Sequence, residues 1–220
     1  MTAFVALVAV AGLAAVVDWT AVARGNARLE YAAKPAVLAA LTVAAAVLPL
    51  ASTDLADRRW WFVAALAASL VGDVLLMLPS DQFVPGLVAF LAGHVLYIVG
   101  LLQPPSTGGF TFSTTGLVVA ALCVVAVAAV PARLIFASLA RSGQRELIGP
   151  VAIYLAAIGT MVVLATNVGV LAAAIGAVLF LASDAILALQ RFVRPMARGD
   201  LAVHVTYHLA QILLVLSLVH

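Results

Sequence analysis

The chain has 220 residues, of which 66% are hydrophobic and only 9% are charged, and its mean hydropathy is +1.23. A soluble globular domain carries about 25% charged residues, so this composition excludes one. The net charge of +2 gives no reason to expect a nucleic-acid partner. Because no polar stretch remains for a second domain, we expect a single integral membrane domain over residues 1–220.

Apolar runs of roughly 20 residues recur along the chain, which is the length that a membrane-spanning helix needs. Strands of a membrane barrel would instead give a weak alternation over about 10 residues. The first run has no basic residue before it, so we expect a retained span rather than a signal peptide. The sequence predicts an all-α bundle of eight transmembrane helices, at roughly residues 2–20, 32–50, 60–79, 83–103, 113–132, 148–166, 168–190 and 201–219.

Polar segments mark most connections between these spans, among them Ser52 to Arg59 and Gln103 to Gly109. The sixth and seventh spans are separated only by Thr166-Asn167. A single bent helix is therefore the alternative to two spans at that point.

Basic residues are unevenly divided between the two ends of the predicted spans. When the loops are numbered alternately, Arg58 and Arg59 fall on one side, and the other nine of the 11 basic residues fall on the opposite side. Cytoplasmic loops accumulate Lys and Arg, so both termini are predicted to face outward. The nine residues that mark the cytoplasmic side are Arg24, Arg28, Lys34, Arg133, Arg141, Arg145, Arg191, Arg194 and Arg198.

Polar positions recur at nearly one offset, which points to an internal repeat. Gly72-Asp73 corresponds to Ser183-Asp184 at a separation of 111 residues, and Gly93-His94 corresponds to Tyr207-His208 at 114 residues. Two parallel four-helix repeats would produce this spacing. Chance matches within the apolar, low-complexity sequence are the alternative.

Asp73 and Asp184 are the main candidates for catalysis. Asp73 lies roughly 14 residues into an outside-to-inside span and Asp184 roughly 16 residues into another, so both reach the cytoplasmic half at similar depth. An ionisable group at membrane depth is costly, which makes function the default explanation. The alternative is a purely structural role, in which each acid only pairs with a neighbouring helix.

The fourth and last predicted spans carry polar side chains that can position a substrate or a water molecule. His94 and Tyr97 are three residues apart and share one helix face, and Tyr207 or His208 shares a face with Gln211. A buried histidine is also often an interhelical hydrogen-bonding residue without a catalytic role, and that alternative stays open here.

Lys34 precedes Pro35 at the predicted start of the second span, where proline is a routine helix opener. The lysine side chain can simply extend to the lipid headgroups. A functional lysine would instead bind a lipid phosphate or hold a catalytic carboxylate in its ionised form.

Several residues near the span ends receive no site role. Asp18 is expected to pair with an arginine of the following loop, and Trp19 is expected to be an interfacial anchor. His204 and His220 lie near the two ends of the last span and are expected at the membrane interface.

The polar residues occur in an order that resembles a known family. Their ordered combination covers nearly the whole chain and is similar to that of the YhhN/TMEM86 lysoplasmalogenase-like family. The C-terminal motif is the loosest, because His208 stands where a variable or aromatic residue is expected. The motifs are Lys34-Pro35, Ser69-x-x-Gly72-Asp73, Phe83-x-x-Gly86, Phe90-x-x-x-His94-x-x-Tyr97, Gly176-Ala177-x-x-Phe180-x-x-Ser183-Asp184 and Tyr207-x-x-x-Gln211.

The resemblance implies an eight-span enzyme that hydrolyses the vinyl ether bond of lysoplasmalogens, giving a fatty aldehyde and glycerophosphoethanolamine or glycerophosphocholine. It implies a lysophospholipid substrate among the membrane lipids, and we expect no cofactor. Alanine-rich usage with arginine preferred over lysine suggests a bacterium of high GC content, so the inner (cell) membrane is the expected location. Plasmalogens are not universal in bacteria, so the native substrate and the oligomeric state stay open.

Vinyl ether hydrolysis suits a pair of carboxyl groups, because it needs an acid and a nearby negative charge. Our hypothesis is that one of Asp73 and Asp184 is the general acid, while the other stabilises the cation and orients water. Lys34 would hold the phosphate. The residues that would position the water and the ether oxygen are His94, Tyr97, Ser183, Tyr207, His208 and Gln211.

Two other functions remain open at this point. A metal-dependent lipid hydrolase would need Asp73, Asp184, His94 and His208 to converge as zinc ligands. A proton-coupled transporter or flippase would use the same buried acids as a proton relay.

Overall fold

The computed structural model describes residues 1–49, 54–103 and 113–219. Within these ranges every regular element is helical, and eight helices are long and apolar enough to cross a membrane. The predicted all-α fold class and its eight spans are thereby confirmed. The helices are α1 (Thr2–Ala23), α2 (Ala27–Val47), α3 (Asp54–Met77), α4 (Phe83–Leu102), α5 (Thr114–Arg141), α6 (Ile148–Asn167), α7 (Leu171–Phe192) and α8 (Gly199–Leu216), with 3₁₀ turns η1 (Arg145–Leu147) and η2 (Ser217–Val219).

Two predicted connections fall partly outside the described residues. Of the connection expected at 52–59, residues 52 and 53 lie outside, and the rest belongs to α3, which begins at Asp54. Of the connection expected at 103–109, residues 104–109 lie outside, as does residue 50 at the end of the second predicted span. His220 lies outside as well.

Helix α2 begins earlier than predicted, which changes the place of Pro35. The Asn26 side chain accepts a hydrogen bond of 3.2 Å from the Leu29 amide and caps the helix at that point. Pro35 is therefore inside α2 and not at its first position, so the expectation of a helix opener was wrong. Proline has no amide hydrogen to donate to the Tyr31 carbonyl one turn earlier.

Helices α5, α6 and α7 also depart from the hydropathy pattern. Pro131 lies inside α5, which continues to Arg141 rather than ending near residue 132. Helices α6 and α7 are separate, so the alternative of one bent helix is excluded. Gly169 lies between them with a φ of +80°, a conformation that glycine adopts without strain.

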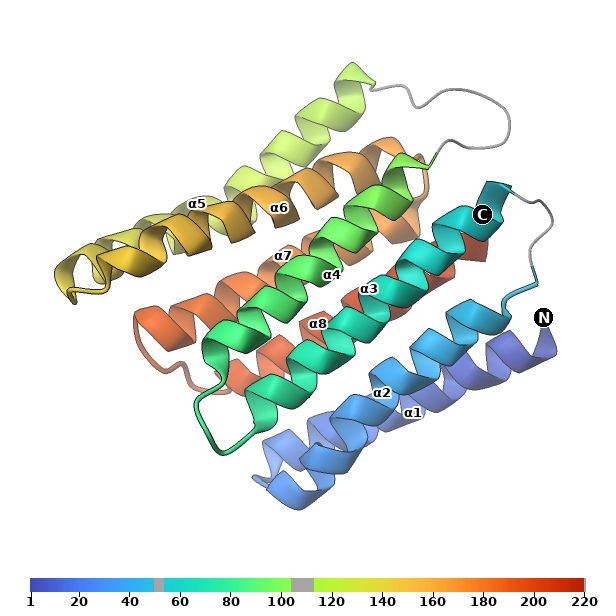
Figure 1. Ribbon diagram of the computed structural model, residues 1–220, viewed down its shortest axis with the longest axis horizontal. Coiled ribbons are helices and arrows are strands. Elements are labelled where there is room, and N and C mark those ends of the chain that lie inside the picture. The colour runs from blue at the N-terminus through green and yellow to red at the C-terminus, as the bar shows by residue number, and fades with distance from the viewer. Residues whose placement is uncertain (50–53, 104–112, 220) are drawn as a thin grey trace.

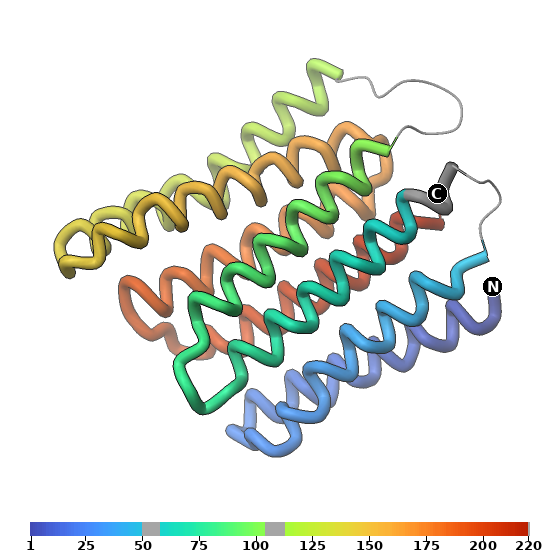
Figure 2. The backbone as a smooth tube through the Cα atoms, viewed as in Figure 1, coloured from blue at the N-terminus to red at the C-terminus, as the bar shows by residue number. Residues whose placement is uncertain are grey.

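The helices form four hairpins that pack side by side in two layers (Figures 1 and 2). One layer contains α2, α3, α4 and α6, and the other contains α1, α8, α7 and α5. The two termini lie at the same end of the bundle (Figure 1). The connections α1–α2, α3–α4, α5–α6 and α7–α8 therefore lie at the opposite end.

Glycine residues bring α3 and α4 close together. A Cβ atom added at Gly72 would lie 2.7 Å from the Phe90 ring, and one added at Gly86 would lie 2.7 Å from Leu76. One added at Gly93 would lie 2.9 Å from the Ser69 hydroxyl oxygen. Small residues are the usual means of close helix packing in membranes. This packing fixes Phe90 beside Asp73, the residue that follows Gly72.

Arg58 and Arg59, near the end of the bundle where the two termini lie, donate hydrogen bonds to backbone carbonyls. The Arg58 guanidinium donates to the carbonyls of Gly100 and Gln103 at 3.3 Å and 2.9 Å. Arg59 donates to the Leu48 carbonyl at 2.9 Å. These bonds link the first part of α3 to the C-terminal ends of α4 and α2.

Candidate active site

A cavity of about 520 Å³ lies at the end of the bundle that carries the α1–α2 and α7–α8 connections. Gly25 of the first connection and Asp200 at the start of α8 line its outer part. Asp73 of α3 and Asp184 of α7 both line it, although 111 residues separate them in the sequence. The structure therefore brings the two candidate acids to one cavity, at the end where most basic residues gather.

Asp73 has a cation and a phenol as partners. Its Oδ1 atom lies 3.4 Å from Nζ of Lys34 on α2, and its Oδ2 atom accepts a hydrogen bond of 2.9 Å from the Tyr207 hydroxyl on α8. The Lys34 and Asp73 side chains are 8% and 1% exposed. A buried charge is stable only with such a partner, so this contact is an ion pair.

Asp184 has a phenol and an imidazole as partners. The Tyr154 hydroxyl on α6 donates to its Oδ2 atom at 2.6 Å, and Nε2 of His94 on α4 lies 3.5 Å from the same oxygen. The Asp184 side chain is 14% exposed, and His94 is wholly buried. Tyr154 was not among the candidates from the sequence. The only indication there was a polar tyrosine in the span that precedes the span of Asp184.

The two aspartates have corresponding partners in the two halves of the chain. Asp73 on α3 takes Lys34 from the preceding helix and Tyr207 from α8. Asp184 on α7 takes Tyr154 from the preceding helix and His94 from α4. Helix α3 corresponds to α7, α2 to α6, and α4 to α8 in this comparison, as two parallel four-helix repeats would require. The packing is not fully symmetric, because α1 packs on α8 whereas α5 packs on α7.

Tyr97 and Gln211 lie behind the cavity. The Tyr97 hydroxyl donates to Oε1 of Gln211 at 2.6 Å, and both residues are wholly buried. Within the described residues, the cavity lining does not include Tyr97, Gln211, His94 or His208. They are therefore not placed to contact a ligand in the cavity directly.

Ser183 lines the cavity beside Asp184 but donates its hydroxyl hydrogen within the fold. Its Oγ atom bonds to the Val203 carbonyl at 3.1 Å and holds α7 against α8. The hydroxyl oxygen retains a lone pair for a ligand or a water molecule.

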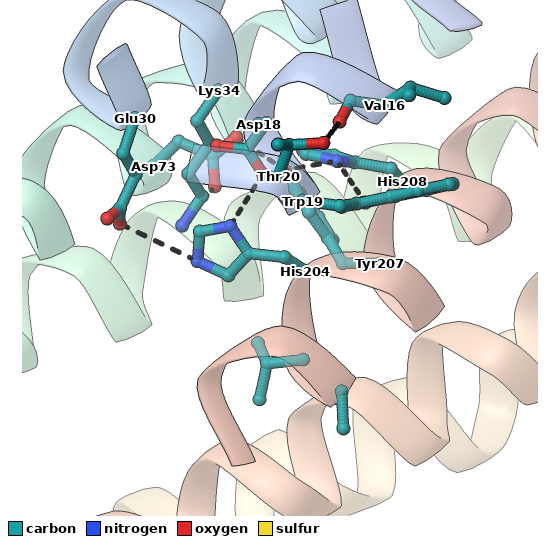
Figure 3. Close-up of polar contacts among 12 residues, drawn as sticks. Val16, Asp18, Trp19, Thr20, Glu30, Lys34, Asp73, His204, Tyr207 and His208 are labelled. Carbon is teal, nitrogen blue, oxygen red and sulfur yellow. Dashed lines mark hydrogen bonds and ion pairs between the residues drawn. The ribbon is translucent and has the colours of Figure 1, made fainter. Parts of the chain in front are cut away.

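Asp18 and His204 correct the expectations from the sequence. Asp18 is wholly buried, and its Oδ2 atom lies 2.7 Å from Nδ1 of His204 instead of pairing with an arginine of the next loop. Nε2 of His204 lies 3.9 Å from Oε1 of Glu30, so the ring sits between two carboxyl groups (Figure 3). His204 and Glu30 both line the cavity. The four-residue spacing of His204 and His208 places both on one face of α8, and His204 is buried there rather than at the membrane interface.

Trp19 and His208 extend this cluster where α1 packs on α8 (Figure 3). The indole nitrogen of Trp19 donates to Nδ1 of His208 at 3.1 Å, and this His208 nitrogen lies 3.7 Å from Oδ2 of Asp18. Trp19 is therefore a hydrogen-bond partner of α8 rather than only an interfacial anchor.

The zinc arrangement considered from the sequence does not form. His94 lies with Asp184, whereas His208 lies with Asp18 and Trp19. Across the described ranges, no three His, Cys, Asp or Glu side chains converge as a metal site.

The fold and the cavity define a multi-pass membrane protein with a buried site built on two carboxyl groups. Comparison with known proteins agrees with this class, because the YhhN family matches residues 29–218. The chain belongs to the YhhN family. No solved structure matches it significantly.

The chain is similar to curated lysoplasmalogenases from bacteria and from mammals. It is 33% identical over 196 residues to "Lysoplasmalogenase" from Mycobacterium bovis and from Mycobacterium tuberculosis, covering 86% of this chain and 70% of those proteins. It is 32% identical over 153 residues to "Lysoplasmalogenase TMEM86B" from Homo sapiens, covering 70% of this chain and 61% of the human protein.

Proposed function

We propose that this chain is a membrane lysoplasmalogenase that cleaves the vinyl ether bond of a lysophospholipid by carboxyl acid–base catalysis. Its similarity to curated lysoplasmalogenases supports the hydrolase class. The observation that carries the mechanism is that Asp73 and Asp184 line one cavity with different partners.

The partners favour Asp184 as the proton donor and Asp73 as the carboxylate. Asp73 faces the ammonium group of Lys34 at 3.4 Å, and an ion pair of this kind requires the ionised acid. Asp184 faces the Tyr154 phenol and the His94 imidazole, neither of which carries a fixed charge. Paired carboxyl groups with unlike surroundings divide the roles of acid and base in this way.

The reaction then proceeds in balanced steps. The Asp184 carboxyl proton adds to the β-carbon of the vinyl ether, and the double-bond electrons form the new C–H bond. The α-carbon and the ether oxygen share the resulting positive charge, which the Asp73 carboxylate stabilises. Water attacks the α-carbon and loses a proton to the Asp184 carboxylate, giving a hemiacetal. The hemiacetal transfers its hydroxyl proton to the glycerol oxygen and separates into an aldehyde and the glycerophospho compound.

The remaining site residues have positioning roles in this scheme. Tyr207 holds Asp73, and Tyr154 and His94 hold Asp184. The lysolipid phosphate would lie toward the outer part of the cavity, where Lys34 and His204 line the wall. We propose that this end faces the cytoplasm of a bacterial cell membrane, because nine of the 11 basic residues belong to it.

The decisive experiment compares three lipids with the purified, detergent-solubilised protein. A lysoplasmalogen is incubated beside the matching saturated ether and ester lysolipids, and the products are analysed for aldehyde and for fatty acid. Aldehyde from the vinyl ether substrate only is the expected result. Fatty acid from the ester would indicate a different lipid hydrolase, and uptake into liposomes driven by a pH gradient without aldehyde would indicate a transporter.

A further inference from the structure

An apolar groove adjoins the polar cavity and shares Asp184 and Leu187 with it. It lies among α4, α5, α6 and α7, on the side of Asp184 away from Lys34 and His204. Within the described residues its wall is apolar except for Tyr154 and Asp184, which are hydrogen-bonded to each other. The mechanism above does not use the rest of this groove.

We infer that the groove holds the first part of the hydrocarbon chain of the substrate. This inference rests on the proposed vinyl ether hydrolysis and deepens it. A lysoplasmalogen changes from polar to apolar at its vinyl ether bond. The protein changes from polar cavity to apolar groove at Asp184. A lipid bound across this boundary therefore has its reactive bond beside Asp184, with the headgroup on one side and the chain on the other.

This placement agrees with the order of atoms in the substrate. The β-carbon, which receives the proton, belongs to the hydrocarbon side of the bond, and the ether oxygen belongs to the glycerol side. Asp184 lines both spaces, whereas Asp73 lines only the polar cavity among the residues described. The geometry thus gives the proton donor access to the β-carbon and leaves Asp73 near the ether oxygen.

The volume of the groove is about 70 Å³, which is much smaller than that of a complete fatty chain. The remaining chain therefore continues into the bilayer beside α5. The outer face of α5 exposes Leu122, Val125 and Val130, at 64%, 62% and 67% of their surface. Such a face is compatible with lipid, so a substrate can enter sideways from the membrane without leaving it.

Ala128 of α5 gives the sharpest test, because it lines the groove and is only 4% exposed. The variant Ala128→Leu adds bulk inside the groove. The matched control, Ala129→Leu, makes the same change at the next residue, which is exposed. For each protein, kcat/KM is measured with a long-chain lysoplasmalogen and with a short-chain vinyl ether analogue that has the same headgroup.

We expect Ala128→Leu to lower the ratio of kcat/KM for the long-chain substrate to kcat/KM for the short-chain analogue about tenfold. Changes of a methylene or more in an apolar pocket have effects of this size. Ala129→Leu should keep the parent ratio. Turnover of the short-chain analogue reports that each variant is folded. An unchanged ratio in Ala128→Leu would overturn the groove assignment.

A second measurement does not depend on turnover. A lysolipid with a photoreactive group near the start of its chain is irradiated with the parent protein, and labelled peptides are identified. Labelling of residues that line the groove, such as Ala128 of α5, Ile158 of α6 and Leu181 of α7, supports the inference, and labelling confined to residues outside the groove contradicts it. If the parent protein releases no aldehyde, the proposed function fails, whereas the labelling pattern still decides whether the groove binds lipid chains.

Discussion

Asp73 and Asp184 occupy corresponding helices of the two halves, yet their surroundings differ in charge. Asp73 is matched by the Lys34 ammonium and a phenol, and Asp184 by a phenol and an imidazole. Both partners differ, since α2 and α8 provide Lys34 and Tyr207 for Asp73, whereas α6 and α4 provide Tyr154 and His94 for Asp184. Lys34 is the partner that carries a fixed charge, and we propose that it separates the roles of the two acids.

Replacement of the acids should have the largest effect on turnover. Asp184→Asn removes the proton donor and should lower kcat about 1,000-fold, while Asp73→Asn removes the stabilising charge and should lower it about 100-fold. Aldehyde release from purified variants measures both. Asp81→Asn, at an exposed loop, is the matched control. A larger loss in Asp73→Asn would exchange the two roles, and parental turnover in either variant would remove that acid from the mechanism.

Removal of the lysine tests what makes the two acids different. Lys34→Met leaves Asp73 buried without its cation, and breaking a buried ion pair in this way costs about 3–5 kcal/mol. We expect a lower Tm and about a 30-fold loss of turnover. The double variant Lys34→Met/Asp73→Asn should recover most of the Tm and remain inactive. Recovery of activity in the double variant would show that the charge on Asp73 is not needed.

The two phenols sharpen the comparison further, because each donates to one acid. A hydrogen bond to a charged group contributes about 1.5–3 kcal/mol and one to a neutral group about 0.5–1.5 kcal/mol. Tyr207→Phe should therefore lower turnover about tenfold and Tyr154→Phe about threefold. Both removals delete one hydroxyl group and keep the ring, so each serves as the control for the other. Equal losses would argue that the acids carry the same charge.

His204 lines the cavity and is bonded to Asp18 rather than to Asp73 or Asp184, so its replacement should affect binding. His204→Gln is expected to raise KM severalfold for a lysolipid with a phosphate headgroup while kcat stays near that of the parent. Asp18→Asn, which removes the carboxylate bonded to His204, should act in the same direction. A fall in kcat with unchanged KM would place His204 in the chemistry instead.

The exposed pair between Arg191 at the end of α7 and Asp81 of the α3–α4 connection should matter least. A hydrogen bond of 2.6 Å from Arg191 holds the pKa of Asp81 below its ordinary value of 3.8. A carboxyl group with a lowered pKa stabilises the folded protein at pH values above its ordinary pKa. This stabilisation is lost as the pH falls through the lowered pKa. Since exposed pairs contribute little, Asp81→Asn should change the Tm by about one degree or less near neutral pH. Any difference from the parent should disappear in strong acid.

The sequence was sufficient to predict the eight spans and to single out the two acids, because both follow from the free-energy cost of placing polar groups in a membrane. Apolar length predicts the spans, and the cost of burying a carboxyl group makes Asp73 and Asp184 conspicuous. Helix ends were less predictable, since α2 and α5 extend beyond their apolar runs. The contact between Asp18 and His204 could not be predicted, because it depends on which face α1 turns toward α8.

Each acid takes one of its partners from the opposite half of the chain, through Tyr207 of α8 and His94 of α4. The two acids and their partners therefore also link the two halves of the chain. A chain with only its first four helices inserted would have Asp73 without the Tyr207 hydroxyl and would lack Asp184. Under the proposed mechanism, such a partly inserted chain would release no aldehyde until α7 and α8 had packed against the first half.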